Sequence, residues 1–146
     1  MTTIEEIAKL QKRLSRLQED YGQHNTAPVD IQRLLEIARV TVEWQDPFIW
    51  DNHTFGDACM IPKRSGFIVR IPGDSKDYHS QWKRFVLGHE IGHTLFYDPI
   101  DLGGDSRVNL RKDIWMSRET EEKLCDKISE VLLMSQKYSL SKPFFF

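Results

Sequence analysis

Two histidines and a glutamate stand in the run H-E-I-G-H, in which His89 and His93 are four residues apart and Glu90 follows the first of them. On a helix, residues four apart lie one turn above each other on the same face, so two imidazoles at this spacing can bind one divalent cation. The glutamate beside the first histidine can then reach a water molecule on that cation. The run therefore predicts metal-assisted hydrolysis, most often of a peptide bond.

A catalytic zinc ion usually has three protein ligands and one open position, so a third ligand must come from elsewhere in the chain. All other histidines precede the motif, and the best downstream candidates are acidic residues of a predicted helix capped by Ser117. Glu122 and Asp126 share one face of it; Glu122 as a ligand and Asp126 as hydrogen-bond partner of a histidine's free nitrogen would complete the site. Glu119 and Glu121 compete for the ligand role, although both could simply offset the helix dipole.

Two segments resemble a known family. The run R-F-V-L-G-H-E-I-G-H-T-L-F (residues 84–96) resembles the signature helix of the ImmA/IrrE family of zinc metallo-endopeptidases, and E-x-x-C-D-x-I-x-x-x-L-L-M (residues 122–134) is similar to its second motif. Residues 28–38 resemble the family's approach to the catalytic helix more loosely. In the family the glutamate of the second motif is the third zinc ligand, which implies this role for Glu122. The Asn or Asp four residues later corresponds to Asp126.

This resemblance covers about residues 28–134 and departs from the family pattern in three places. Gly88 stands where Ala is more frequent, Ser135 stands where Pro is usual, and residues 127–129 are more polar than the common aromatic-Ala-Ala stretch. None of these changes removes a ligand. The resemblance implies a zincin-like, gluzincin-type fold, one zinc ion, and cleavage of helix-turn-helix transcriptional repressors that silence a mobile element or a stress response.

Zinc suits two imidazoles and one carboxylate best, although Mn²⁺ could also bind this set. Such an ion lowers the pKa of a water molecule and polarises the scissile carbonyl, while Glu90 is the expected general base. A further donor is needed for the oxyanion, and His79, Tyr97 and Tyr138 are the candidates. Two alternatives to a peptidase stay open: a non-catalytic or regulatory metal-binding interaction module, and a metallohydrolase of small amides.

The elements that position these residues can also be read from the sequence. Apolar residues at helical spacing predict a helix over residues 78–97, capped by Asp77 or Ser75 and ended by Asp98-Pro99. An N-terminal helix over about residues 3–21 begins with a capping box formed by a threonine and a glutamate, and its apolar stripe is expected to pack on its own domain. A second helix is expected over about residues 30–39.

Three short β-runs follow, over residues 40–44, 56–61 and 66–71. Helices on either side of a small three-stranded sheet predict an α+β fold rather than a parallel, doubly wound one. By the resemblance, part of residues 56–61 or 66–71 would pair with the substrate backbone as an edge strand. Trp115, in the segment between the two ligand helices, is expected to cover the core.

Composition predicts a single domain, residues 1–146, with a catalytic core over about residues 28–138 and a short C-terminal tail. A net charge of −2 without a basic excess argues against direct contact with nucleic acid, and no apolar run is as long as a membrane span. The N-terminus lacks the pattern of a secretory signal, and two cysteines are too few for a disulfide framework. We therefore expect a cytoplasmic protein. The partner that the family resemblance implies is a protein substrate, a DNA-binding repressor.

Overall fold

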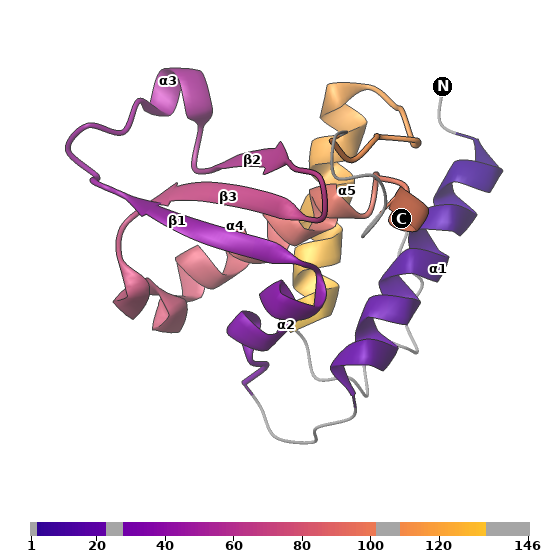
Figure 1. The fold of residues 1–146 in the computed structure, drawn as a ribbon, viewed down its shortest axis with the longest axis horizontal. Coiled ribbons are helices and arrows are strands. Elements are labelled where there is room, and N and C mark those ends of the chain that lie inside the picture. The colour runs from indigo at the N-terminus through magenta and orange to yellow at the C-terminus, as the bar shows by residue number, and fades with distance from the viewer. Residues whose placement is uncertain (1–2, 23–27, 102–108, 134–146) are drawn as a thin grey trace.

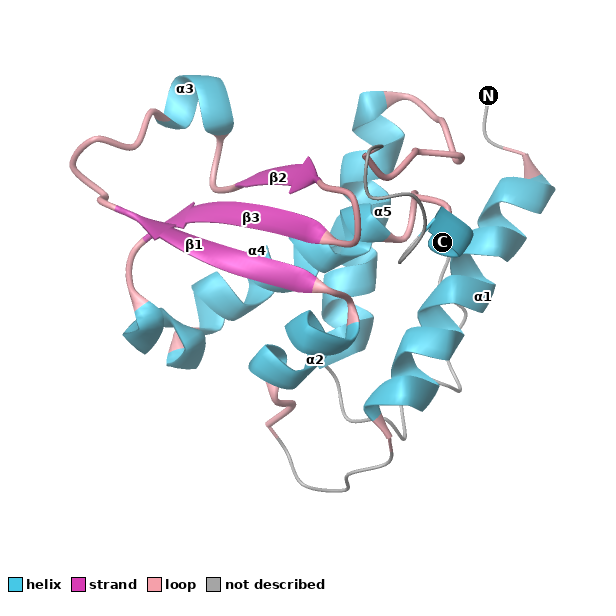
Figure 2. Cartoon of the chain, viewed as in Figure 1, coloured by secondary structure: helices cyan, strands magenta, loops and turns pink. Residues whose placement is uncertain are grey.

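The computed structural model describes residues 3–22, 28–101 and 109–133, and its architecture is the α+β class expected from the sequence. Within these residues one three-stranded sheet is combined with five α-helices (Figures 1 and 2). The α-helices are α1 (Ile4–Tyr21), α2 (Ile31–Ile37), α3 (Asn52–Phe55), α4 (Gln81–Thr94) and α5 (Arg118–Leu133). The strands are β1 (Val40–Gln45), β2 (Cys59–Pro62) and β3 (Phe67–Pro72), and η1 (Ser75–His79) and η2 (Pro99–Asp101) are 3₁₀ helices.

The sheet has the order β1-β3-β2, with β1 parallel and β2 antiparallel to the central strand β3. Along β3 every second residue is buried, namely Phe67, Val69 and Ile71, because one face of the sheet is covered by helices. On the other face Arg70 forms an ion pair with Glu43 of β1 at 2.9 Å. Since β3 is paired on both sides, β2 is the strand whose outer edge, on the side of α3, has no partner strand among the described residues (Figure 1).

The helix that carries the H-E-I-G-H run, α4, is shorter than expected at both ends. It starts after Ser80, whose hydroxyl accepts a backbone N–H of the first turn. The expected caps, Asp77 and Ser75, lie instead in η1, a separate 3₁₀ turn with its own capping residue, Asp74. At the other end the α-helix stops at Thr94, several residues before the Asp-Pro pair.

Close packing of α4 against α5 depends on small residues. A Cβ atom on Gly92 would lie 3.1 Å from Cα of Cys125, and a Cβ atom on Gly88 would overlap Oγ of Ser129. The Ser129 hydroxyl also donates a 2.7 Å hydrogen bond to the carbonyl of Phe85 on α4. Two glycines one turn apart thus let the helices approach closely enough for carboxylates of α5 to reach the histidines of α4.

The N-terminal helix α1 begins with the predicted capping box, in which Thr3 and Glu6 exchange hydrogen bonds. Its apolar stripe is buried in the domain, as expected, and Leu10 is fully buried. Arg13 binds the backbone carbonyls of residues 95 and 97 just after α4 and pairs with Asp113 through two nitrogen–oxygen contacts of 2.9 and 2.7 Å. This arrangement anchors α1 to the C-terminal end of the metal-motif helix.

Several other expectations can be compared with the structure. Asp30 caps α2 as predicted, whereas Trp115 is 65% exposed, so its expected role as a cover for the core is wrong. Tyr138 and the C-terminal tail lie outside the described residues. None of the helices within residues 3–22, 28–101 and 109–133 has both the length and the apolar character needed to cross a bilayer.

Candidate metal centre

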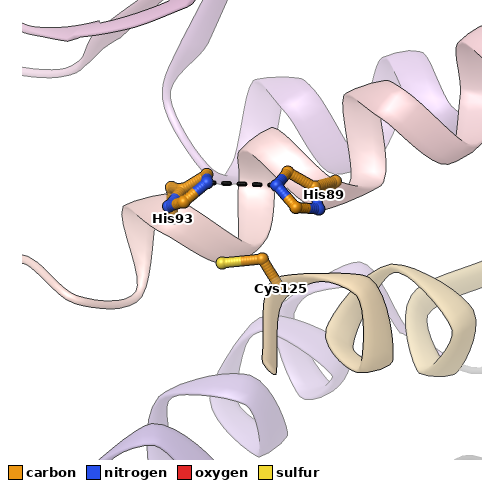
Figure 3. A group of neighbouring side chains, drawn as sticks. All are labelled: His89, His93 and Cys125. Carbon is orange, nitrogen blue, oxygen red and sulfur yellow. Dashed lines mark hydrogen bonds between the residues drawn. The ribbon is translucent and has the colours of Figure 1, made fainter. Parts of the chain in front are cut away.

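The two histidines of α4 point the same atoms at each other. Nε2 of His89 and Nε2 of His93 are 3.1 Å apart, and the two rings are nearly perpendicular, with centroids 4.8 Å apart (Figure 3). This geometry follows from their spacing, because residues four apart on a helix lie one turn above each other.

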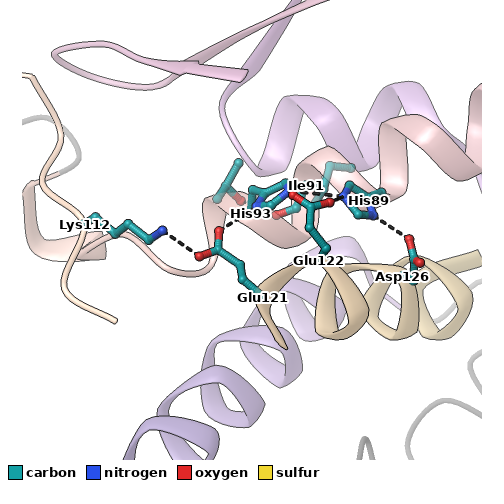
Figure 4. Close-up of polar contacts among 8 residues, drawn as sticks. His89, Ile91, His93, Lys112, Glu121, Glu122 and Asp126 are labelled. Carbon is teal, nitrogen blue, oxygen red and sulfur yellow. Dashed lines mark hydrogen bonds and ion pairs between the residues drawn. The ribbon is translucent and has the colours of Figure 1, made fainter. Parts of the chain in front are cut away.

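Glu122 on α5 faces the same point. Its Oε2 lies 2.8 Å from Nε2 of His89, and its Oε1 lies 3.3 Å from Nε2 of His93 (Figure 4). Ligand atoms at about 2.0–2.1 Å from a tetrahedral zinc ion would lie roughly 3.3–3.4 Å from one another. The three side chains are therefore brought together at separations only slightly shorter than a zinc ion between them would impose.

One further carboxylate contacts the outer nitrogen of each imidazole. Oδ1 of Asp126 lies 2.6 Å from Nδ1 of His89, and Oε2 of Glu121 lies 2.7 Å from Nδ1 of His93 (Figure 4). A carboxylate can only accept here, so each Nδ1 must carry the proton, which leaves the lone pair of each Nε2 for the shared centre. Asp126 thus lies where the sequence placed it.

The sequence predicts Glu121 only as a competing ligand or as a residue that offsets the helix dipole. Its contact with the outer nitrogen of His93 is seen only in the structure. Its other oxygen, Oε1, accepts a 2.6 Å hydrogen bond from Nζ of Lys112. The spacing of the two histidines could have predicted the contact between Glu121 and His93. Two imidazoles one helical turn apart need two carboxylates for their outer nitrogens, at a similar separation along the facing helix. Glu121 and Asp126, five residues apart on one helix, satisfy that need.

The charges around the centre favour a cation. Hydrogen bonding to His93 is the main reason that the pKa of Glu122 falls to about 2. Burial lowers the pKa of His93, but hydrogen bonds to Cys125, Glu121 and Glu122 outweigh it and raise this pKa to about 12. Two facing Nε2 lone pairs repel each other unless a positive charge lies between them, and in the metal-free site a proton on His93 supplies that charge. The donor set consequently fits a divalent metal ion.

Cys125 offers a different third donor. One donor atom from each of His89, His93 and Cys125 lies within 4.8 Å of the others, and the cysteine comes from α5 on the side facing the two rings (Figure 3). Its side chain is fully buried, and burial is the main reason that the pKa of its thiol rises to about 11. Since Glu122 has a lowered pKa and its oxygens lie 2.8 and 3.3 Å from the two Nε2 atoms, Glu122 is the better third ligand.

Glu90, the expected general base, is only 7% exposed although it lines a pocket. Burial raises its pKa above the ordinary value, and the negative charges of Glu122 and Asp57 act in the same direction. The two histidines partly oppose this rise when they are charged. A carboxylate with a raised pKa is a stronger base than an exposed one, which suits proton transfer near neutral pH.

The pocket in front of this centre has a volume of about 730 Å³ and is bounded by α3, α4 and α5. His89, Glu90, Glu122 and Asp126 all line it, together with residues 52–58 and three further side chains of α4, namely Trp82, Phe85 and Val86. Arg118, one helical turn before Glu122, also belongs to this lining. The candidate centre is therefore open to a ligand from one side.

None of the three expected oxyanion donors is found among the described residues that line the pocket. His79 is exposed in η1, and Tyr97 packs edge-on against Phe67 with ring centroids 5.3 Å apart; neither is among the residues that line the pocket. Tyr138 lies outside the described residues. Donors that do line the pocket include His53 and Arg118, which the sequence did not single out. His53 is distant from both motifs in the sequence, whereas Arg118 lies one helical turn before Glu122 and could have been found from that spacing.

Comparisons with known proteins add no assignment: no protein-family model, no curated protein and no solved structure matches this chain. The resemblance to ImmA/IrrE motifs is thus a likeness of short segments only.

Proposed function

We propose that this protein is a zinc-dependent endopeptidase. The observation that carries the proposal is the convergence of three donor side chains from two helices, with Nε2 of His89, Nε2 of His93 and the carboxylate of Glu122 within 3.3 Å of one another. A buried glutamate, Glu90, lines the same open pocket. Two imidazoles and one carboxylate with an open fourth side are the donor set of catalytic zinc sites in several peptidases.

Zinc is the metal that fits this set best, and Mn²⁺ is an alternative with the same charge. When bound, the ion supplies Lewis-acid polarisation of a carbonyl and lowers the pKa of a water molecule. His89, His93 and Glu122 hold it, while Asp126 and Glu121 fix the ring orientation through the outer nitrogens.

Glu90 moves the proton in this proposal. Its carboxylate accepts a proton from the attacking water and delivers that proton to the nitrogen of the scissile bond as the carbon–nitrogen bond breaks. The acid and the amine products thereby receive all the atoms of the water. Burial of Glu90 supports this role, because it raises the pKa of the carboxyl towards the range in which it can both take and give a proton.

The outer edge of β2 is the better candidate for pairing with the substrate backbone. Of the two segments considered, residues 66–71 belong largely to β3, which already has a partner on each side. Within the described residues β2 has a strand partner on one side only, and Ala58, immediately before it, lines the pocket. An extended peptide added to that edge would lie beside the metal centre.

For the substrate we propose a helix-turn-helix transcriptional repressor, cleaved to relieve repression of a mobile element or a stress response. The support is the resemblance of residues 84–96 and 122–134 to ImmA/IrrE motifs. A net charge of −2 is compatible with binding a basic, DNA-binding protein.

Metal analysis and one isosteric variant test the proposal. Purified protein should contain about one zinc ion per chain, and replacing both His89 and His93 by Ala should abolish that content. Glu90→Gln should keep the metal but lose cleavage of a repressor, because the amide cannot accept the proton. Unchanged metal in the double variant, or continued cleavage by Glu90→Gln at the wild-type rate, would refute the assignment.

Cys125 favours a second candidate function, a metal-stabilised interaction module without catalysis. If the thiol joined the two histidines and Glu122, four protein ligands would close the site, as in structural zinc sites. Cys125→Ala separates the two functions. A structural site should lose most of its zinc affinity in this variant, whereas the peptidase site should keep both its metal and its cleavage.

A further inference from the structure

We infer that one wall of the metal pocket is a specificity subsite for a large apolar side chain of the peptide substrate. This inference rests on the proposed endopeptidase function and adds a class of substrate residue to it. The wall, called here the aromatic wall, consists of Phe55 on α3 and Trp82 and Phe85 on α4. All three line the pocket that contains His89, Glu90 and Glu122.

The aromatic wall leaves much apolar surface in contact with water. Trp82 is 56% exposed and Phe55 is 46% exposed, although the core has ample apolar residues of its own. Trp82 and Phe85 are three residues apart on α4, and their rings are stacked with an interplanar angle of 19° and centroids 6.0 Å apart. Their stacked rings present a preformed flat surface, which could bind an apolar group at little cost in side-chain entropy.

Chance exposure explains a single aromatic residue on a surface, but it does not explain this group. Residues from two separate elements contribute rings to the pocket that is also lined by His89 and Glu122. Ala58 and Val86 extend the same lining with apolar side chains. Charged side chains also line the pocket, namely Arg118 and Asp126 from α5 and Asp57 two residues after Phe55. An apolar group is therefore expected to bind on the rings of the aromatic wall and not across the whole pocket.

Distances along α4 set the position of the substrate side chain. Phe85 precedes His89 by four residues and Trp82 precedes it by seven, which corresponds to about 6 Å and about 10 Å along the helix axis. An extended peptide advances about 3.3 Å per residue. For a peptide lying along α4, the aromatic wall therefore faces a residue two or three positions from the scissile bond.

The test uses short synthetic peptides of alanine, serine and glycine in which one position at a time is changed to Phe, Leu, Ala, Asp or Lys. For wild-type protein with zinc, kcat/KM for Phe or Leu should exceed that for Ala about tenfold or more at one position only. Trp82→Ala and Phe85→Ala should reduce this ratio towards one. Phe48→Ala is the matched control, since Phe48 is 97% exposed on the neighbouring loop and does not line the pocket.

Calorimetric binding of the same peptides to the zinc-loaded Glu90→Gln variant gives a readout that does not need catalysis. Tighter binding of the Phe peptide, lost on adding Trp82→Ala but kept with Phe48→Ala, supports the subsite. Equal affinities of Phe, Ala and Asp peptides, or equal losses in the Trp82 and Phe48 variants, overturn it. Selective binding without any cleavage by wild-type protein would refute the peptidase function while the subsite stands.

Discussion

The histidines of the candidate centre are held by two carboxylates in unequal surroundings. The side chain of Glu121 is 11% exposed and is shared between His93 and Lys112, whereas that of Asp126 is 54% exposed where it contacts His89. A hydrogen bond shielded from water is stronger than an exposed one. The orientation of His93 should therefore depend on Glu121 more than that of His89 depends on Asp126.

Replacing Glu121 tests this asymmetry. Glu121→Gln should weaken zinc binding about 10–100-fold, because the amide cannot provide the same charged acceptor to Nδ1 of His93. Asp126→Asn should have a smaller effect, and Glu122→Ala a larger one. Glu119→Gln is the control, since Glu119 is 79% exposed and pairs only with Lys123 in the described part of the helix. Competition with a chromophoric chelator measures the affinities, and equal losses for Glu119→Gln and Glu121→Gln would contradict the prediction.

The residue that stabilises the oxyanion can be sought among the hydrogen-bond donors that line the pocket. His53 on α3 and Arg118 on α5 both line the pocket and can both donate to an oxygen. We expect His53→Ala or Arg118→Ala to lower kcat about 10²–10³-fold, with zinc content unchanged, since the donor acts on the transition state and not on the metal. Wild-type kcat in both variants would show that neither side chain is the oxyanion donor, which would leave Tyr97 and Tyr138 as candidates.

At the scale of elements, the crossing of α4 and α5 decides whether the ligands meet. Gly88→Ala should lower the free energy of unfolding by about 1–3 kcal/mol, because the new methyl group overlaps Oγ of Ser129. It should also weaken zinc binding, since α5 has to move away with Glu122. Ser129→Ala alone should cost about 1 kcal/mol for the hydrogen bond to the carbonyl of Phe85.

The double variant makes this prediction specific. Ser129→Ala removes Oγ, the atom that the new methyl group would overlap, while Cβ of residue 129 stays 3.2 Å from that group. Combining it with Gly88→Ala should therefore recover part of the lost stability and zinc affinity. Chemical denaturation of the four proteins in a double-mutant cycle measures the coupling. Strictly additive losses would show that the two residues do not limit the approach of the helices.

Features that depend on neighbouring residues, such as helix caps, could be predicted from the sequence. Features that depend on pairing between distant segments, such as the strand order, could not. The caps at Thr3 and Asp30 were predicted correctly because a side chain bonds to a backbone N–H only two or three residues away. The cap of α4 was wrong because Ser75, Asp77 and Ser80 offer the same chemistry within six residues. The strand order β1-β3-β2 depends on pairing between distant segments, which no local pattern encodes.

The candidate site shows the same division. His89, His93, Glu122 and Asp126 were selected because each pair obeys the four-residue spacing of a helix face. Glu121 was not assigned its contact with His93, because a carboxylate in the first turn of a helix already has a sufficient local explanation. His53 and Phe55 on α3 line the pocket only through tertiary structure, so the spacing of residues could not reveal them. Trp82 and Phe85 lie seven and four residues before His89 on α4, and helical spacing alone places them on its side of the helix.

At the scale of the whole molecule, α1 fixes the end of the metal-motif helix through ion pairs of Lys9 and Arg13 with Asp113. Arg13 is 13% exposed and binds Asp113 while it also donates to the carbonyls of Leu95 and Tyr97. Burial opposes ionisation of Asp113, but hydrogen bonds and charge from Arg13 and Lys9 outweigh it and lower its pKa. The carboxylate therefore contributes stability above its unfolded-state pKa, and the contribution is lost as the pH falls through the lower, folded-state pKa.

Asp113→Asn should consequently lower the free energy of unfolding of the metal-free protein by about 1–3 kcal/mol near neutral pH. The deficit relative to wild type should stay constant above the ordinary pKa of an aspartate, about 4, and shrink as the pH falls from there through the lower folded-state pKa of Asp113. Glu43→Gln is the control, because the Glu43–Arg70 pair is nearly half exposed on the outer face of the sheet and should contribute about 0–1 kcal/mol. Urea unfolding in the presence of a chelator at several pH values measures both effects. A deficit that persists unchanged in acid, or one no larger than that of Glu43→Gln, would mean that α1 is held by its apolar stripe and not by Arg13 and Asp113.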